Sequence, residues 1–172
     1  MTVLLRPPAI ADVPALAALG RDSFVAKFAS LYRPEDLACF LEETHSEAAV
    51  AAQLADPDRL YCLAERDGRL AGYCKLALVP DFPEHARGKR PIELKQLYTA
   101  PDATGGGIGG ALMEWALDAA RSHGADEIQL SVWSRNHAAQ RFYARHGFAK
   151  VADVFFRVGE QLDEEFLFSV LL

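Results

Sequence analysis

Apolar side chains recur every three or four positions along several stretches of the chain, which is the period of an amphipathic helix. The first such stretch begins at Val13, with Asp12 at the N-cap position and Pro14 in the first turn, and both residues favour a helix start. One later stretch carries four apolar residues at helical spacing that we expect to face the core: Ile108, Leu112, Trp115 and Ala119. The pattern predicts helices that begin near positions 12, 34 and 46, and two more over residues 111–123 and 137–146.

Other stretches alternate between apolar and polar residues, or are short and wholly apolar, as β-strands are. They predict a first strand that ends at Pro7-Pro8, followed by strands over residues 60–65, 70–79, 92–99, 128–133, 148–158 and 166–172. Asp67-Gly68 separates two of these strands, and this dipeptide favours a two-residue hairpin turn.

The strand over residues 92–99 breaks its own alternation. Ile92 and Leu94 are in phase, whereas the next aliphatic residue, Leu97, is one position late. A one-residue bulge near Lys95-Gln96 would restore the phase and leave backbone groups unpaired. A strand covered on both faces needs no alternation, so that alternative stays open.

Length and composition place the chain among ordinary globular proteins. Its 172 residues suit a single domain, 1–172, and 51% are hydrophobic and 24% charged. No apolar run approaches the roughly 18 residues that a membrane span needs, and the first residues do not resemble a signal peptide. The three cysteines, Cys39, Cys62 and Cys74, form no metal-like pair. We therefore expect a cytoplasmic protein with no bound metal and no membrane partner.

The charge is acidic and unevenly distributed. The formal net charge of −6 argues against general nucleic-acid binding, which requires a basic face. Residues 34–58 contain seven acidic residues and no Lys or Arg. This stretch is either a set of solvated helix faces or a surface that attracts a polycation.

Five glycines lie within the seven residues Thr104 to Gly110, between a predicted strand and a predicted helix. Glycine costs about 1 kcal/mol relative to alanine within a helix, so this cluster requires an explanation. The first four N–H groups of a helix have no internal partner, and the helix dipole is positive there. The cluster therefore predicts a site where backbone N–H groups bind a phosphate, although a flexible turn is the simpler alternative.

The glycine run satisfies the dinucleotide-binding pattern G-x-G-x-x-G, but its place in the chain argues against that function. The dinucleotide motif belongs to the first βαβ unit, whereas few strands follow this run. Asp126 and Glu127 have the spacing of the motif's acidic residue, but they precede a strand instead of ending it. No Gly-Lys-Ser/Thr follows, which excludes a P-loop.

Residues 101–113 resemble the pyrophosphate-binding segment of the GNAT N-acetyltransferase family, Gln/Arg-x-x-Gly-x-Gly/Ala, with Gly107 and Gly109 at its two small positions. Residues 131–148 resemble a second family segment, with Asn136, Phe142-Tyr143 and Gly147-Phe148 in order. The resemblance covers nearly the whole chain. It implies the GNAT α/β fold, a mixed, mostly antiparallel twisted sheet of six to seven strands flanked by helices. It also implies an acetyl-CoA-dependent N-acetyltransferase.

Two residues depart from the family pattern. Thr104 stands where Gln or Arg is usual, and Gly106 stands where a basic residue is common. Without those side chains, phosphate binding would rest more on the backbone N–H groups.

The resemblance also implies the roles of individual residues. Tyr143 would protonate the departing thiolate, although a core tyrosine is the simpler alternative. Glu93 would take the proton of the amine, with a solvated glutamate paired to Lys95 or Arg90 as the alternative. Asn136 would contact the cofactor, cap the following helix, or do both. The implied coenzyme A-binding residues are Leu97, Tyr98, Thr99, Thr104, Gly105, Gly107, Ile108, Gly109, Gly110, Asn136, Phe142, Tyr143 and Arg145.

Within the family, residues 22–37 and 71–76 look like the branch that acetylates polyamines such as spermine and spermidine. A protein amine or an amino-sugar would use the same machinery, and a non-catalytic acyl-CoA-binding regulator could share the fold. Relatives are commonly dimers, so a homodimer is a further expectation.

Overall fold

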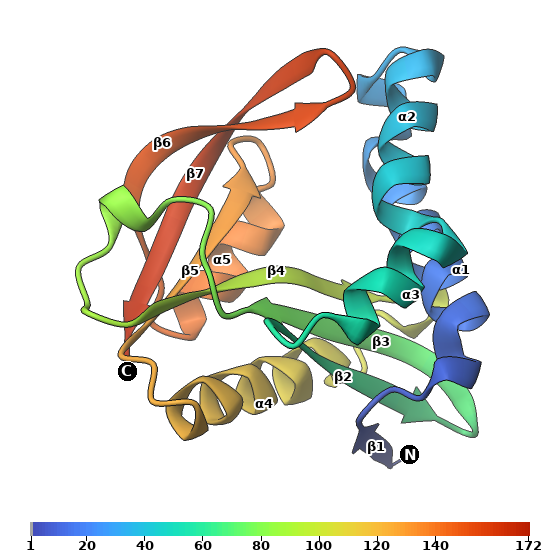
Figure 1. Ribbon diagram of the computed structural model, residues 1–172, viewed down its shortest axis with the longest axis horizontal. Coiled ribbons are helices and arrows are strands. Elements are labelled where there is room, and N and C mark those ends of the chain that lie inside the picture. The colour runs from blue at the N-terminus through green and yellow to red at the C-terminus, as the bar shows by residue number, and fades with distance from the viewer. Residues whose placement is uncertain (1) are drawn as a thin grey trace.

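The computed structural model describes residues 2–172, which fold around one open sheet (Figure 1). Its strands are β1 (Val3–Arg6), β2 (Arg59–Arg66), β3 (Arg69–Ala77), β4 (Pro91–Thr99), β5 (Glu127–Trp133), β6 (Ala149–Val158) and β7 (Gln161–Leu171). Its α-helices are α1 (Val13–Phe28), α2 (Pro34–His45), α3 (Glu47–Ala55), α4 (Ile108–Ser122) and α5 (His137–Arg145). Among the described residues, none of the helices has the length and apolar character needed to cross a membrane.

The seven strands lie in the order β1-β2-β3-β4-β5-β7-β6, and only the β4–β5 pair is parallel. The predicted mixed, mostly antiparallel sheet is therefore confirmed. A dinucleotide-binding fold requires a mostly parallel sheet with its glycine motif after the first strand, so this sheet excludes that alternative.

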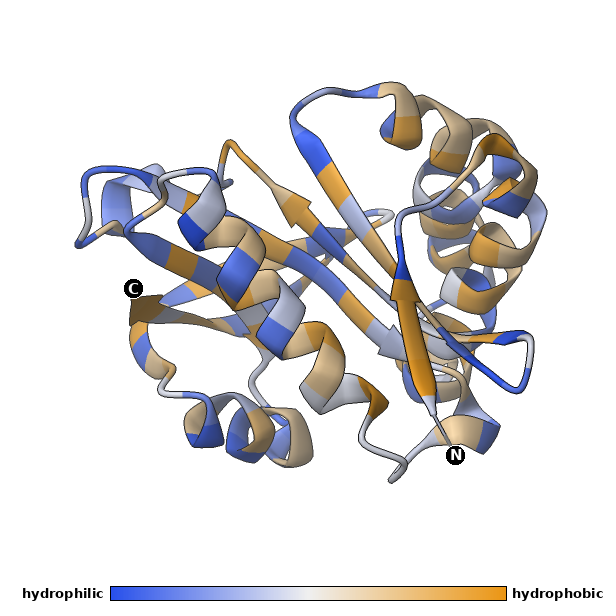
Figure 2. Cartoon of the chain, turned by 90° about the horizontal axis from the view of Figure 1, so that it is seen from below, coloured by the Kyte–Doolittle hydropathy of each residue, from blue (hydrophilic) through white to orange (hydrophobic). Residues whose placement is uncertain are grey.

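Helices cover both faces of the sheet, and the alternation of residues along the strands decides which face each side chain joins. Cys62, Cys74 and Leu76 join the core beneath α4, whereas Leu63 and Tyr73 join the core beneath α1 and α3. In Figure 2, α4 lies across one side of the sheet and its ribbon alternates between hydrophilic and hydrophobic residues. Neighbouring residues of a strand enter different cores, which explains why a tyrosine is followed by a cysteine in both β2 and β3.

Of the two alternatives for β4, the structure has the bulge. Lys75 of β3 lies opposite Gln96, while the next residue, Leu76, lies opposite Leu94, so Lys95 is the extra residue. Leu94 and Leu97 therefore both reach the core beneath α4.

Strands β4 and β5 pair over only three residues, Pro91 to Glu93 on β4 and Glu127 to Gln129 on β5. Beyond Glu93 they diverge, while β4 stays paired with β3 and β5 stays paired with β7 (Figure 1). The sheet thus opens along one line, and the edge of β4 after the bulge faces the opening.

Most predicted boundaries of helices and strands agree with the structure within a few residues. Two boundaries and the burial of one residue differ. Helix α4 begins at Ile108, so Gly109 and Gly110 lie inside it. Trp115 is half-buried, because the fully buried stripe of α4 runs through Leu112, Met113, Ala116 and Ala120. Strand β7 begins at Gln161, five residues before its predicted start. The Asp67-Gly68 turn has the positive φ angles, 52° and 73°, that the hairpin requires.

Two acidic residues at the start of β5 hold the loop that precedes β4. Glu127 is fully buried, and its carboxylate accepts hydrogen bonds from Arg87 N (2.8 Å), Gly88 N (2.7 Å) and the Ser169 hydroxyl. Asp126 accepts two more, from Lys89 N and Arg90 N, in an exposed position. These bonds fix the end of the loop where β4 meets β5.

We predict that Glu127→Ala lowers the free energy of unfolding by about 3 kcal/mol, because it leaves the buried Ser169 hydroxyl and the part-buried N–H groups of Arg87 and Gly88 without their acceptor. Asp126→Ala is the matched control and should cost about 1 kcal/mol, since water replaces its exposed hydrogen bonds. Urea denaturation followed by circular dichroism measures both values. Equal losses in the two variants would show that the buried carboxylate has no special part in holding the loop.

Candidate active site

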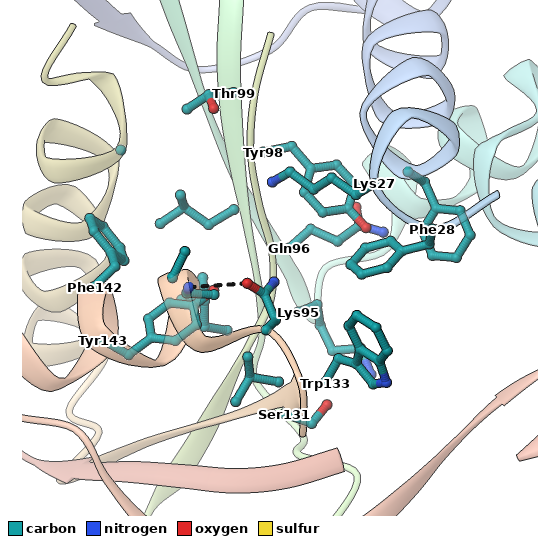
Figure 3. Close-up of a pocket in the computed structure, with 18 of the residues that line it drawn as sticks. Lys27, Phe28, Lys95, Gln96, Tyr98, Thr99, Ser131, Trp133, Phe142 and Tyr143 are labelled. Carbon is teal, nitrogen blue, oxygen red and sulfur yellow. Dashed lines mark hydrogen bonds between the residues drawn. The ribbon is translucent and has the colours of Figure 1, made fainter. Parts of the chain in front are cut away.

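A cavity of about 760 Å³ occupies the opening between β4 and β5. Residues 94–99 of β4 line one side and Ser131 to Trp133 of β5 line the other, with α1, α5 and the glycine loop around them. In Figure 3, Lys27 and Phe28 of α1 lie on the side opposite Phe142 and Tyr143 of α5. The volume lies within the range typical of small-molecule sites.

The glycine run forms one end of this cavity. Gly105 and Gly107 have φ angles of 77° and 78°, which side-chain-bearing residues rarely adopt, and Gly107 is the N-cap of α4. Four of the glycines line the cavity: Gly105, Gly107, Gly109 and Gly110. A Cβ atom at Gly105 or Gly107 would meet nothing within 4 Å, so the backbone there is open to a ligand. The N-terminus of α4 thus presents free N–H groups to the cavity.

A basic side chain does reach the glycine loop, although it comes from elsewhere in the chain. Arg66, at the end of β2, donates a 2.6 Å hydrogen bond from Nη2 to the carbonyl oxygen of Gly106. A Cβ atom at position 106 would lie 1.9 Å from that nitrogen, so a side chain there would displace the guanidinium of Arg66. The loss of a side chain at Gly106 is therefore matched by a guanidinium from the β2–β3 hairpin, which the sequence did not reveal.

Tyr143 lies on the face of α5 that lines the cavity, next to Phe142 (Figure 3). Burial and the nearby Glu165 raise the pKa of its phenol well above the usual value. The hydroxyl is consequently protonated at neutral pH, and the raised pKa also makes it a weaker acid than an exposed phenol. Tyr143 also packs on Phe148, with ring centroids 6.0 Å apart, so the residue has a structural contact as well.

The structure brings most of the predicted binding residues together. Besides the four glycines, the lining includes Leu97, Tyr98, Thr99, Asn136, Phe142, Tyr143 and Arg145. Asn136 caps α5 by accepting a 3.1 Å hydrogen bond from Ala139 N. Two predicted residues lie outside the lining: Ile108 is buried in the core, and the Thr104 hydroxyl is directed to the carbonyl of Pro101.

Glu93 does not lie in the cavity lining with Tyr143. Its carboxylate is buried, accepts a 2.8 Å hydrogen bond from Asp81 N and lies 3.4 Å from Lys95 Nζ. Burial raises its pKa. Through these partners, Glu93 joins the loop before β4 to the bulged strand β4.

The end of the cavity away from the glycine loop is lined by aromatic rings and one carboxylate. Phe28 of α1 and Trp133 of β5 meet edge to face with centroids 6.1 Å apart, and Phe24 and Phe156 complete the wall. The carboxylate belongs to Glu165 of β7. Desolvation raises its pKa to about 7, against a hydrogen bond with the Ser131 hydroxyl that lowers it.

Sequence reasoning missed Glu165 because it placed the start of the last strand at Phe166. With the strand extended to Gln161, Glu165 is in phase with the buried residues Leu167 and Ser169. An acidic residue in phase with buried neighbours is the signal that identifies a cavity-facing carboxylate. Because the predicted strand began after Glu165, this signal was not recognised.

The acidic stretch over residues 34–58 contributes no side chain to this cavity. Asp36 binds Arg33 (2.8 Å) and accepts a hydrogen bond from Glu160 N (3.0 Å), which joins α2 to the β6–β7 hairpin. Across residues 2–172, no three His, Cys, Asp or Glu side chains are grouped as a metal site would require.

Comparison with known proteins places this site in a family. The model of the acetyltransferase (GNAT) family matches residues 25–148. An uncharacterized N-acetyltransferase from the pepI 3′ region of Lactobacillus delbrueckii subsp. lactis is 30% identical, over 94% of this chain and 92% of its own. The chain belongs to the acetyltransferase (GNAT) family; it is an acyltransferase enzyme, and acetyl-CoA is its acyl donor.

Two further similarities come from Thermoplasma acidophilum. Its spermidine N(1)-acetyltransferase is 26% identical, over 89% of this chain and 91% of its own. The crystal structure of its PaiA N-acetyltransferase in complex with coenzyme A superposes with a TM-score of 0.81 at 23% identity, covering both chains fully. That superposition supports the fold.

We predict that Gly107→Ala weakens acetyl-CoA binding at least tenfold, because a side chain at φ 78° costs about 1–2 kcal/mol and would shift the N–H groups of α4. Gly124→Ala is the matched control at the other end of α4, where φ is 74°. It should lose similar stability and keep its affinity for acetyl-CoA. Calorimetric titration and thermal melting separate the two effects, and equal affinity in both variants would contradict the assignment.

Proposed function

We propose that the enzyme transfers the acetyl group of acetyl-CoA to a primary amine, which attacks the thioester directly within the cavity between β4 and β5. The observation that carries this proposal is that one cavity joins the open N-terminus of α4 to Tyr143. The N-terminus of α4 suits a pyrophosphate, and Tyr143 suits the reacting end of the same molecule.

The residues present suit coenzyme A along its length. The glycine loop is open where a side chain would intrude, and Arg66 adds a positive charge behind it. After the bulge, β4 has no strand partner on its β5 side, so backbone groups between Leu97 and Thr99 can bond the amides of the pantetheine arm, except the Thr99 carbonyl, which accepts a hydrogen bond from the Ser23 hydroxyl. Arg145 lines the cavity at the exposed end of α5, where it would bind a phosphate.

Tyr143 would act at the reacting end. The amine forms the new C–N bond as the C–S bond breaks, and the sulfur leaves as a thiolate. Burial raises the pKa of the Tyr143 phenol and makes it a weak acid, so it can give that thiolate a proton when the acetylated nitrogen returns a proton to the phenolate. Because the acceptor must be a neutral amine to attack, the site also requires a group that takes a proton from the ammonium form.

A polyamine is the first acceptor to test. Support comes from the resemblance to the polyamine-acetylating branch of the family and from the similarity to a spermidine acetyltransferase. Lys27 in the cavity wall counts against a long polycation. An amino-sugar or a protein amine uses the same chemistry. The cytoplasmic location and the homodimer stay predictions.

The purified protein, acetyl-CoA and a panel of amines test the proposal in a thiol-release assay, with mass spectrometry of the acetylated product. We expect thiol release that depends on the amine, with polyamines among the substrates. Binding of acetyl-CoA without turnover of any amine would instead favour a non-catalytic acyl-CoA-binding regulator.

We predict that Tyr143→Phe lowers kcat about 100-fold while the KM for acetyl-CoA changes little, because only the proton donor is removed and the ring remains. Tyr98→Phe is a useful comparison, since Tyr98 also lines the cavity but packs edge to face on Tyr73 at 5.5 Å. Unchanged kcat in Tyr143→Phe would remove Tyr143 from the mechanism.

A further inference from the structure

The carboxylate of Glu165 lies in the cavity in a position that the fold determines. Its strand partners are Trp133 of β5 on one side and Val154 of β6 on the other. Opposite residues of an antiparallel pair project from the same face, so Glu165 and Trp133 project together into the cavity. Ser131, two residues before Trp133 on the same face, also lines the cavity, and its hydroxyl lowers the pKa of the carboxylate.

The surroundings of Glu165 are those of a cation-binding site. The rings of Phe24, Phe28, Trp133 and Phe156 line the same end of the cavity. Ring faces attract an ammonium group. A carboxylate in an aromatic enclosure therefore suits a protonated amine better than a neutral or anionic group.

The charged groups near Glu165 on β7 and β4 have partners of their own, whereas Lys27 of α1 lines the same cavity without an ion pair among residues 2–172, and burial lowers its pKa. Asp163, on the same strand, accepts hydrogen bonds from the Tyr32 hydroxyl and from Gln161 Nε2. On β4, Lys95 bonds Asp81, and Glu93 bonds Asp81 N.

The same neighbours set the charge on Glu165. Burial, Asp163 and Glu93 raise its pKa, while Ser131 and Lys95 lower it, which leaves the value at about 7. The phenols of Tyr32, Tyr98 and Tyr143, all with raised pKa values, stay neutral around it.

We propose that Glu165 binds the ammonium group of the acceptor and takes its proton, and that the acceptor is consequently a primary amine whose adjoining carbons are apolar enough to lie against the aromatic wall. This inference rests on the proposed function and identifies a catalytic base at the end of the cavity opposite the glycine loop.

The protons balance over one turnover. Glu165 takes one proton from the ammonium, and the neutral amine forms the C–N bond with the acetyl carbon. The C–S bond breaks, and Tyr143 gives its proton to the sulfur. The nitrogen then loses its second proton, which restores the hydroxyl of Tyr143, and Glu165 releases its proton to solvent. The products are the amide, free coenzyme A and one proton.

A base of this kind imposes a pH dependence of known sign. Glu165 is protonated and inactive below its pKa, and it becomes a carboxylate as the pH rises through about 7. The kcat/KM of the wild type should therefore rise across that range.

Glu165→Gln tests the assignment, because it keeps the shape of the side chain and removes the base. We expect kcat to fall about 100-fold or more, the rise of kcat/KM near pH 7 to disappear, and the affinity for acetyl-CoA to stay unchanged. Glu164→Gln is the matched control, since Glu164 is the adjacent, exposed residue on the other face of β7. It should retain wild-type kcat and pH profile.

Glu165→Asp provides a second variant. It keeps a carboxylate one carbon further from the amine, so we expect partial activity with the rise near pH 7 retained. Wild-type kcat and pH profile in Glu165→Gln, measured with an amine that the wild type acetylates, would overturn the inference and leave the acetyltransferase function standing. A wild type that acetylates no amine would refute the proposed function itself.

Discussion

The divergence of β4 from β5 after three paired residues is the constraint on which the rest of the structure depends. Two neighbouring parallel strands that separate leave backbone N–H and C=O groups inside the protein without strand partners, and such groups require other partners. The β4 bulge at Lys95 turns those groups toward the opening, and the bonds of Asp126 and Glu127 to the preceding loop fix where the opening begins. An extended ligand with its own amide groups is the natural partner for that edge.

The two ends of the opening differ in electrostatic character. At one end, the glycine loop and the start of α4 present N–H groups, with Arg66 behind them, which favours anions. At the other end, aromatic rings and Lys27 line the cavity with the carboxylate of Glu165, and the carboxylate and the rings favour a cation. Tyr143 lines the same cavity. A phosphate-bearing donor and a protonated acceptor would thus enter opposite ends, so that their reactive groups meet beside a proton donor.

Much of this could be predicted from the sequence, because the signals were local. Helical spacing, the Asp67-Gly68 turn, the phase break at Leu97 and the glycine cluster each act within a few residues. Arg66 and Glu165 could not be found in that way. Arg66 meets Gly106 forty positions away, and Glu165 acquires its role from Trp133 and Ser131 on a neighbouring strand. Glu93 was chosen by family position, whereas its burial against Asp81 depends on a loop whose path no local pattern reveals.

A crystal structure of the protein with coenzyme A tests the central claim most directly. The account predicts the pyrophosphate at the N–H groups of the glycine loop, the pantetheine arm along Leu97 to Thr99, and the sulfur beside the Tyr143 hydroxyl. Coenzyme A bound outside the opening between β4 and β5, or with its sulfur remote from Tyr143, would contradict it.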